Sequence, residues 1–406
     1  MQIRNHPPLH LSYCLNVHPG ETWADNLAAI RGNALAVRDR VSANRPFGLG
    51  LRLSRAAVDT LREPRQLEAF RDFLADNGLY AFTINGFPYG TFHGKPVKAD
   101  VYRPDWSTPE RRDYTVGLAR VLAALLPEGT DGSISTVPLS YKLWPNPEAK
   151  IRQMVITLAD TVAELHRIHE DSGKEIHLGL EPEPDCTLET TDEVIRFFEG
   201  PLNVQGGDRL IAQLGCSRTE AESLLRRHLG VCFDTCHLAL QFEPLAASLN
   251  RLNRHGIRLS KVQLSSALET RPSETARRQL ADFSDPVYLH QVKTLNPADL
   301  TTGEFPDLPA ALASPPPVAD GTRWRVHFHV PLYFESEGEL HSTSRSLDFD
   351  FWEHLVRLPI SHLEIETYTF HVLPPTLQTQ GVVDSIVREF KWVTPRLQAA
   401  LNRNNR

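Results

Sequence analysis

Ligand-type side chains close four short apolar runs of the 406-residue sequence. These side chains, one at the carboxyl end of each run, are Glu181, Asp234, Gln263 and Glu366. If the runs are neighbouring strands of one parallel sheet, alternation places the four side chains on the inner face at the same height. Carboxylates that converge in a buried place are costly unless a cation neutralises them. The pattern therefore predicts a divalent metal site.

Histidines offer further ligands to such a site. His237 follows Asp234 by three residues, and a His-x-His pair, His327 and His329, lies in a later apolar run. Oxygen and nitrogen donors together suit Mn²⁺, Zn²⁺, Fe²⁺, Co²⁺ or Mg²⁺, and the sequence does not choose among them. A single acidic residue after a strand is usually a helix cap or a solvated loop residue, and His-x-His also occurs in ordinary strands. The prediction therefore rests on the coincidence of four ligand-type residues.

Eight short runs rich in β-branched and aromatic residues alternate with stretches whose apolar residues repeat at the helical period. The runs are residues 11–17, 47–53, 80–85, 133–139, 176–181, 230–234, 258–264 and 362–366. Alternating strands and helices predict a parallel sheet. Eight repeats favour a closed (β/α)8 TIM barrel over an open sheet, and no glycine-rich nucleotide-binding motif follows any run. We expect residues 1–406 to form a single barrel domain with its function at the carboxyl ends of the strands.

Two of the expected helices begin at recognisable signals. Ser107 with Glu110, and Ser217 with Glu220, have the spacing of capping boxes, in which the serine and the acidic residue each satisfy a backbone amide of the other. We therefore expect helices to start directly after Ser107 and Ser217.

One connection departs from the repeat. About a hundred residues separate the seventh run from the eighth, which is too many for one crossover. We expect residues 270–345 to form an insertion over the barrel mouth, with a small second domain as the alternative. This stretch holds a proline-rich loop at 305–318 and a ninth strand-like run at 324–331, which carries His327 and His329.

Composition narrows the class of protein. The chain is 41% hydrophobic and 23% charged, which suffices for a large packed core. Its formal net charge of −7 argues against a general nucleic-acid binder. No apolar run approaches the roughly 18 residues that a membrane helix needs, and the five cysteines do not form a disulfide framework. We expect a cytoplasmic protein with no membrane span and no nucleic-acid partner, and a homo-oligomer stays open.

Motifs at the run ends resemble a known superfamily. Asp-Thr-Cys-His at 234–237, Leu-Glu at 180–181 and Glu-Thr at 366–367 are similar to motifs of the xylose isomerase-like TIM barrels. These include sugar and sugar-phosphate isomerases and epimerases, and nucleases of the endonuclease IV type. More specifically, three stretches resemble the EboE family, the metabolite-traffic proteins of the bacterial ebo gene cluster. They are Tyr-Cys-Leu-Asn-Val-His at 13–18, Asn-Gly-Phe-Pro-Tyr-Gly-Thr-Phe-His-Gly at 85–94 and Ser-Ile-Ser-Thr-Val-Pro at 133–138.

The resemblance implies a ligand set. Carried over residue by residue, the superfamily's metal ligands fall on Glu181, Asp234 and Glu366. The strand-seven position, normally histidine, is Gln263, whose amide oxygen is a weaker and uncharged ligand. Either metal affinity is lower, or His327 or His329 completes the site, because the nuclease branch supplies a similar His-x-His element.

The resemblance also implies a reaction. In the similar epimerases the strand-five and strand-eight glutamates remove and return the proton beside a carbonyl, and these roles fall on Glu181 and Glu366. His237, His18 and Asn85 would then contact substrate oxygens.

Three functions stay open at this point. The first is a metal-dependent isomerase or epimerase acting on a sugar, sugar phosphate or cyclitol, in which Arg271 and Arg345 could meet an anionic group. The second is a non-catalytic carrier of a small polyhydroxylated metabolite, which Gln263 favours. The third is a metal-dependent phosphodiesterase or nuclease. Asn85 and residues 136–138 oppose this last function, because the nuclease branch has histidines there.

Overall fold

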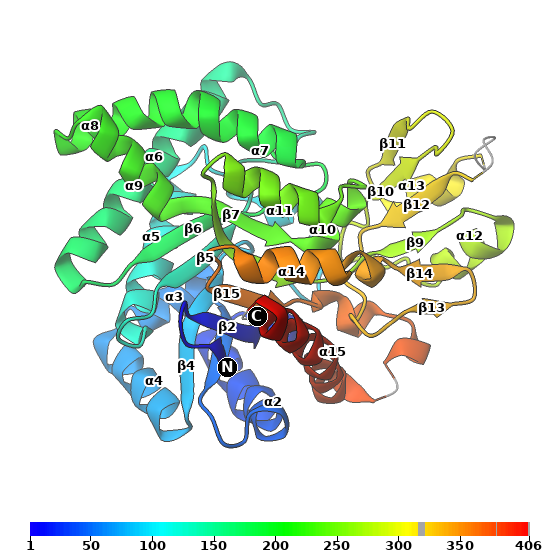
Figure 1. The fold of residues 1–406 in the computed structure, drawn as a ribbon, viewed down its shortest axis with the longest axis horizontal. Coiled ribbons are helices and arrows are strands. Elements are labelled where there is room, and N and C mark those ends of the chain that lie inside the picture. The colour runs from blue at the N-terminus through cyan, green and yellow to red at the C-terminus, as the bar shows by residue number, and fades with distance from the viewer. Residues whose placement is uncertain (316–320, 379, 405–406) are drawn as a thin grey trace.

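Eight parallel strands form a barrel (Figure 1). The structure is a computed structural model that describes residues 1–315, 321–378 and 380–404. Around the barrel the strands are β2 (Leu9–Tyr13), β15 (His362–Ile365), β8 (Arg258–Leu264), β7 (Leu229–Asp234), β6 (Ile176–Leu180), β5 (Gly132–Thr136), β4 (Leu79–Asn85) and β3 (Phe47–Arg52). A bridge between Cys14 and Gly50 joins the two end strands. The predicted (β/α)8 barrel is confirmed, and each of the eight predicted runs overlaps one of its strands.

Helices surround the barrel and connect its strands (Figure 1). They are α1 (Trp23–Ala29), α2 (Leu35–Val41), α3 (Arg55–Leu61), α4 (Pro64–Asp76), α5 (Pro109–Leu125), α6 (Glu148–Ser172), α7 (Thr191–Phe197), α8 (Gly207–Leu214), α9 (Arg218–His228), α10 (Thr235–Leu240), α11 (Leu245–Arg254), α14 (Phe349–Arg357) and α15 (Gly381–Asn404). A short strand, β1 (Gln2–Arg4), pairs antiparallel with β2. Within the described residues, none of the helices combines the length and apolar character that crossing a membrane requires.

The two predicted helix starts have different outcomes. Ser217 forms the expected capping box with Glu220 at the start of α9. The box predicted at Ser107 is wrong, since α5 begins at Pro109 and its N-cap residue is Thr108. The physical reason is a competing acceptor, because the Ser107 backbone amide, which Glu110 would bond in the box, donates to Asp105 Oδ1 at 3.0 Å.

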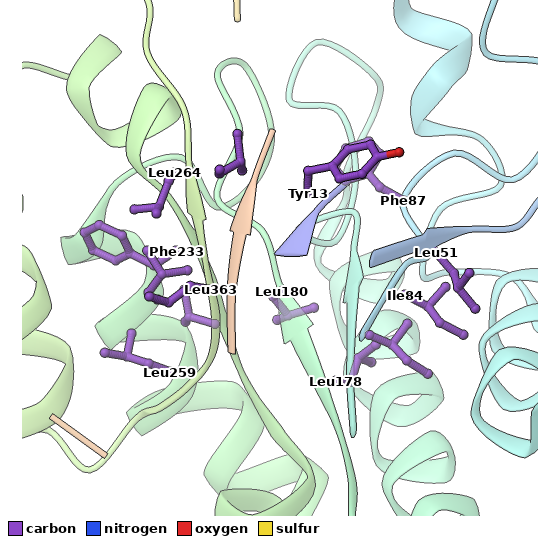
Figure 2. Close-up of a cluster of buried hydrophobic side chains, with 14 of the residues drawn as sticks. Tyr13, Leu51, Ile84, Phe87, Leu178, Leu180, Phe233, Leu259, Leu264 and Leu363 are labelled. Carbon is purple, nitrogen blue, oxygen red and sulfur yellow. The ribbon is translucent and has the colours of Figure 1, made fainter. Parts of the chain in front are cut away.

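Aliphatic side chains fill the layer between strands and helices. Leu178, Leu180, Phe233 and Leu363 are each at most 1% exposed and belong to one large hydrophobic core (Figure 2). They alternate along the strands with polar residues, as expected for strands with one face toward the helices.

The inner faces of the strands carry a buried ion pair. Lys261 on β8 and Glu364 on β15 lie 2.5 Å apart and both side chains are fully buried. Gly50 on β3 leaves room for the pair, because a Cβ atom there would lie 1.9 Å from Glu364 Oε1. Lys261 and Glu364 each stand two residues before a candidate site residue, Gln263 and Glu366, on the same face of their strands. The ion pair therefore lies directly beneath the candidate site.

A histidine cluster closes the amino end of the barrel. His177 on β6 contacts Asp131 through Nε2 at 3.0 Å, and Arg258 on β8 lies 2.9 Å from the same carboxylate. His10 on β2 contacts the Tyr80 hydroxyl at 2.8 Å. Burial is the main cause that lowers the pKa of both His177 and His10 to about 3. Both rings are therefore neutral in the folded chain near pH 5.

We predict that acid destabilises the fold through these rings. Below the ordinary histidine pKa of 6.5, His177 and His10 are protonated in the unfolded chain but stay neutral in the folded chain. The free energy of unfolding should therefore fall as the pH drops from 6.5 toward 4, by roughly 1 kcal/mol per pH unit for each ring. Urea unfolding of the His177→Gln variant should show a smaller pH slope. The exposed His341→Gln variant should keep the wild-type slope, and an unchanged slope in His177→Gln would contradict the prediction.

The long connection forms a second, antiparallel sheet beside the barrel (Figure 1). Its strands, in spatial order, are β11 (Thr302–Phe305), β10 (Val292–Leu295), β12 (Arg323–Val326), β9 (Leu268–Thr270), β14 (Leu340–Ser342) and β13 (Ser336–Glu337), with helices α12 (Glu274–Ala281) and α13 (Leu308–Ala313). The ninth predicted run is shorter than expected, since β12 ends at Val326 and both histidines of the His-x-His pair follow it. Residues 316–318 of the predicted proline-rich loop lie outside the described residues.

Candidate metal and substrate site

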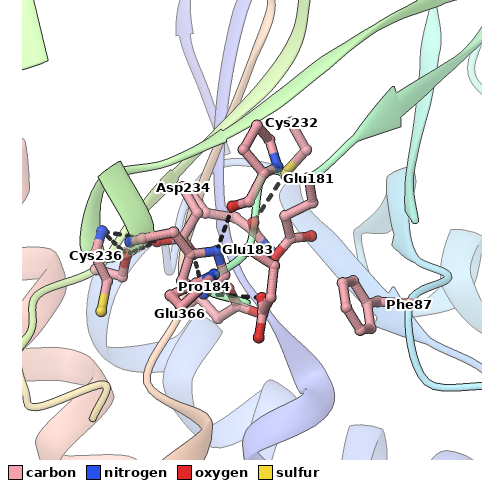
Figure 3. A network of polar contacts seen from close by, with 12 residues as sticks. Phe87, Glu181, Glu183, Pro184, Cys232, Asp234, Cys236 and Glu366 are labelled. Atoms are coloured by element: carbon pink, nitrogen blue, oxygen red, sulfur yellow. Dashed lines mark hydrogen bonds and ion pairs between the residues drawn. The ribbon is translucent and has the colours of Figure 1, made fainter. Parts of the chain in front are cut away.

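Three carboxylates converge at the carboxyl end of the barrel (Figure 3). Glu181 follows β6, Asp234 ends β7 and Glu366 follows β15. One oxygen from each lies within 4.8 Å of the others, and none of the three residues is more than 3% exposed. Each also has one buried oxygen without a hydrogen-bond partner in the described chain, namely Glu181 Oε2, Asp234 Oδ2 and Glu366 Oε2. Unpartnered buried oxygens are costly, so these atoms fit a cation.

Local structure explains which oxygen of Asp234 is free. Asp234 is the N-cap of α10, and its Oδ1 accepts hydrogen bonds from the backbone amides of Cys236 at 2.7 Å and His237 at 3.1 Å. The Ser265 hydroxyl donates to the same oxygen at 2.7 Å. The side chain is therefore a helix cap through one oxygen, and its orientation leaves Oδ2 available for another ligand.

Three imidazoles lie beside the carboxylates with their Nδ1 atoms occupied. His237 donates from Nδ1 to the Pro182 carbonyl at 3.0 Å, and His329 donates to the Glu366 carbonyl at 3.0 Å. His327 Nδ1 contacts Gln291 Oε1 at 2.7 Å. These acceptors assign the proton to Nδ1 and leave the Nε2 lone pairs free, which is the usual preparation of metal-ligating histidines.

The imidazoles form three further groups of possible ligands, with the ligand atoms of each group within 4.8 Å of one another. The groups are Asp234, His237 and His329; Glu183, His237 and His327; and Cys236, His327 and His329. The Nε2 atoms of His237 and His329 lie 3.4 Å apart. Two facing lone pairs at that distance repel unless a proton or a cation lies between them. Because Asp234 also belongs to the carboxylate group, the arrangement could hold one cation or two adjacent ones.

The electrostatics of the site reflect its burial. Burial and the nearby charge of Asp234 raise the pKa of Glu181 to about 8, and burial with Glu181 raises the pKa of Glu366 well above its usual value. Burial opposes ionisation of Asp234, but His237 and His329 outweigh it and lower its pKa. Burial lowers the pKa of His329 to about 4. A cation at this place would therefore displace protons from Glu181 and Glu366.

A pocket opens directly onto these groups. The free space between its walls is about 510 Å³, part of which is open to solvent. Its polar lining residues are Asn16, Asn85, Lys98, Glu181, Glu183, His237, His327, His329 and Glu366. The remaining lining residues are Phe87, Pro88, Phe92, Val97, Val101, Tyr102, Tyr288, Leu289 and Tyr368.

Comparison with solved structures identifies the fold. A xylose isomerase domain protein from Alicyclobacillus acidocaldarius subsp. acidocaldarius is 12% identical, with 96% of this chain and 99% of that chain covered and a TM-score of 0.50. This chain has the xylose isomerase-like TIM-barrel fold. The IolI protein with a bound zinc atom is 11% identical, with 97% of this chain and 99% of that chain covered and a TM-score of 0.48. No protein-family model matches the sequence, and neither does any curated protein.

Within this xylose isomerase-like barrel, Asn85 contacts a candidate metal ligand, whereas the side chain of Gln263 bonds to a cysteine outside the predicted ligand set. Asn85 donates to Glu366 Oε1 at 3.0 Å and lines the pocket. Gln263 accepts a hydrogen bond on Oε1 from the Cys232 thiol at 2.9 Å, and its Nε2 has no partner among the described residues.

Other residues named from the sequence lie elsewhere. His18 is not among the residues that line the pocket, and its ring nitrogens contact the Tyr13 hydroxyl at 3.0 Å and the Asn33 amide at 3.3 Å. Arg271 and Arg345 do not line it either, since Arg271 is exposed and Arg345 pairs with Glu269. Neither arginine is placed to meet an anionic group of a molecule in this pocket.

Two site residues were missed from the sequence. Glu183 lies 3.3 Å from His237 Nε2, and Asn16 donates to Glu366 Oε1 at 2.7 Å. A signal for Glu183 was present in the Glu-Pro-Glu motif at 181–183, because residues two apart in an extended chain share a face. Asn16 gave no comparable signal, since its partner is 350 residues away.

Proposed function

We propose that this chain is a metal-dependent isomerase or epimerase that acts on a small polyhydroxylated metabolite, a sugar, sugar phosphate or cyclitol. The observation that supports it most is the convergence of Glu181 and Glu366, each with an unpartnered buried oxygen, beside a small-molecule pocket. Two carboxylates placed at one point suit removal of a proton from a carbon and its return.

The proposed roles follow from the contacts. A divalent cation bound by Glu181, Asp234 and Glu366, with His329 or His237, would polarise a substrate carbonyl and its neighbouring hydroxyl. Glu366 then takes the proton from the carbon beside that carbonyl, and Glu181 returns it on the other side. Asn16 and Asn85 hold Glu366 Oε1 by hydrogen bonds of 2.7 and 3.0 Å, which leaves Oε2 without a hydrogen-bond partner.

We also propose that the chain belongs to the EboE family and works in the cytoplasm. The stretches at 13–18, 85–94 and 133–138 support the first proposal. The cysteines support the second, because all five are free thiols and none is in a disulfide.

Deuterium exchange tests the proposed reaction. Protein loaded with Mn²⁺, Co²⁺ or Zn²⁺ is incubated in D₂O with candidate ketoses and inososes, and loss of the proton beside the carbonyl is followed by NMR. We expect exchange that stops when the metal is removed by chelation. Binding without exchange for every ligand would favour a carrier instead, and cleavage of abasic DNA without small-molecule binding would favour a nuclease.

A further inference from the structure

The pocket also has an apolar part to its lining. Phe92, Val97 and Tyr288 form a hydrophobic cluster separate from the main core, and Tyr368 packs against it. The rings of Phe92, Tyr288 and Tyr368 meet pairwise, with centroids 5.2 to 5.4 Å apart. They come from three segments distant in sequence, the loop after β4, the insertion and the segment after β15. All three rings line the pocket.

The only lysine or arginine that lines the pocket within the described residues is already satisfied. Lys98 Nζ lies 2.7 Å from Asp307 Oδ2 and 2.6 Å from the Tyr288 carbonyl, with the Asp285 carbonyl at 3.4 Å. An ammonium group has three donors, and these acceptors use all of them.

Two nearby guanidinium groups do not line the pocket, and each has a single nitrogen without a partner, Arg52 Nε and Arg111 Nη2. Arg52 donates to the carbonyls of Gly20 and Gly90 and pairs with Glu21, and Arg111 donates to backbone carbonyls. A phosphate group in this pocket would meet the three lining glutamates, Glu181, Glu183 and Glu366, and no free lysine or arginine from the described residues. Unpaired like charges in a buried place are unfavourable.

We infer that the site takes an uncharged polyol bearing an apolar group, and not a phosphorylated sugar. This rests on the proposed function, whose substrate class it narrows. The hydroxyl and carbonyl oxygens face the acidic and imidazole wall. The apolar group packs on Phe92, Tyr288 and Tyr368, which exclude water from that side of the pocket.

Three matched probes test the inference by calorimetry on the Mn²⁺-loaded full chain. They are D-fructose, D-fructose 6-phosphate and 6-O-benzyl-D-fructose, which differ in the group on O6. Because only free fructose can close a pyranose ring through O6, its affinity is calculated for its furanose and open-chain fraction. We expect the benzyl ether to bind at least tenfold more tightly than fructose, and the phosphate at least tenfold more weakly. The Phe92→Ala variant should lose the preference for the ether while its Mn²⁺ content stays at the wild-type value.

Two further variants are controls that show whether a loss of preference in Phe92→Ala results from misfolding. Phe92→Leu keeps most of the apolar volume and should lose part of the preference. Phe349→Ala removes a ring on α14 that is 52% exposed and should change nothing. Tighter binding of the phosphate than of fructose, equal binding of ether and fructose, or no binding of any probe would each overturn the inference.

The outcome is separable from that of the proposed reaction. If the ether binds best but no deuterium exchange occurs, the inferred substrate class is supported and the proposed isomerase activity is contradicted. If exchange is fastest on the 6-phosphate, the isomerase activity is supported and the inferred substrate class is contradicted.

Discussion

The Asp234→Asn variant is expected to lose tight binding of divalent cations. Asp234 belongs to the carboxylate group with Glu181 and Glu366 and to the group with His237 and His329. Asparagine can keep the cap of α10, because the cap bonds end on Oδ1 alone. It places an amide NH₂ where Oδ2 now stands, and an NH₂ group offers protons to a cation instead of lone pairs. Since loss of a residue that merely orients a ligand costs about 10- to 100-fold in affinity, we expect a loss of about 100-fold or more here.

Two measurements check this result. Calorimetric titration of metal-free protein with Mn²⁺, Co²⁺ and Zn²⁺ gives the affinities directly. Thermal unfolding gives a second readout, because a ligand at 1,000 times its Kd stabilises the folded chain by about 4 kcal/mol. The Asp192→Asn variant is the control, since that carboxylate is 60% exposed and pairs with Arg251 on the surface. Wild-type affinity for these cations in Asp234→Asn would contradict the proposed metal site.

The barrel could be predicted because its signals are local. The runs at 176–181 and 230–234 combine apolar residues with a polar side chain at one end, and each is a strand in the structure. The convergence of Glu181, Asp234 and Glu366 followed from their common position at the ends of neighbouring strands. In a parallel barrel that position fixes both the height and the face of a side chain.

The insertion and the buried ion pair could not be predicted, because they depend on contacts between residues that are distant in the sequence. The strands of the insertion are two to four residues long, too short to show an alternating pattern. Residues 327–330 therefore read as part of a strand, whereas the chain leaves β12 at Val326 and carries both histidines into the pocket. The Lys261–Glu364 ion pair likewise joins residues 103 positions apart, so only the closed barrel brings them together.

The Glu366→Gln variant is expected to lose proton exchange while the side chain at position 366 keeps its two hydrogen bonds. Asn16 and Asn85 both donate to Oε1, and the carbonyl oxygen of glutamine can accept the same two bonds. The change is confined to Oε2, the oxygen without a partner, which becomes an amide nitrogen that cannot accept a proton. General-base removal lowers rates by about 100- to 10,000-fold. Because the amide also weakens the cation ligand at this position, as in Asp234→Asn, the loss is measured at the Mn²⁺ concentration that saturates the variant itself.

A matched control separates base removal from loss of a buried carboxyl. Glu389 on α15 is 1% exposed, and burial raises its pKa to about 7. Its Oε1 accepts from the Leu332 amide at 3.1 Å and from the Thr367 hydroxyl at 2.6 Å, so glutamine preserves both bonds here too. Exchange should therefore persist in Glu389→Gln and fail in Glu366→Gln. If both variants exchange at the wild-type rate with metal bound, Glu366 is a ligand only and another group must be the base. Loss of exchange in Glu366→Gln alone would therefore identify Glu366, which lines the pocket, as the group that accepts the proton.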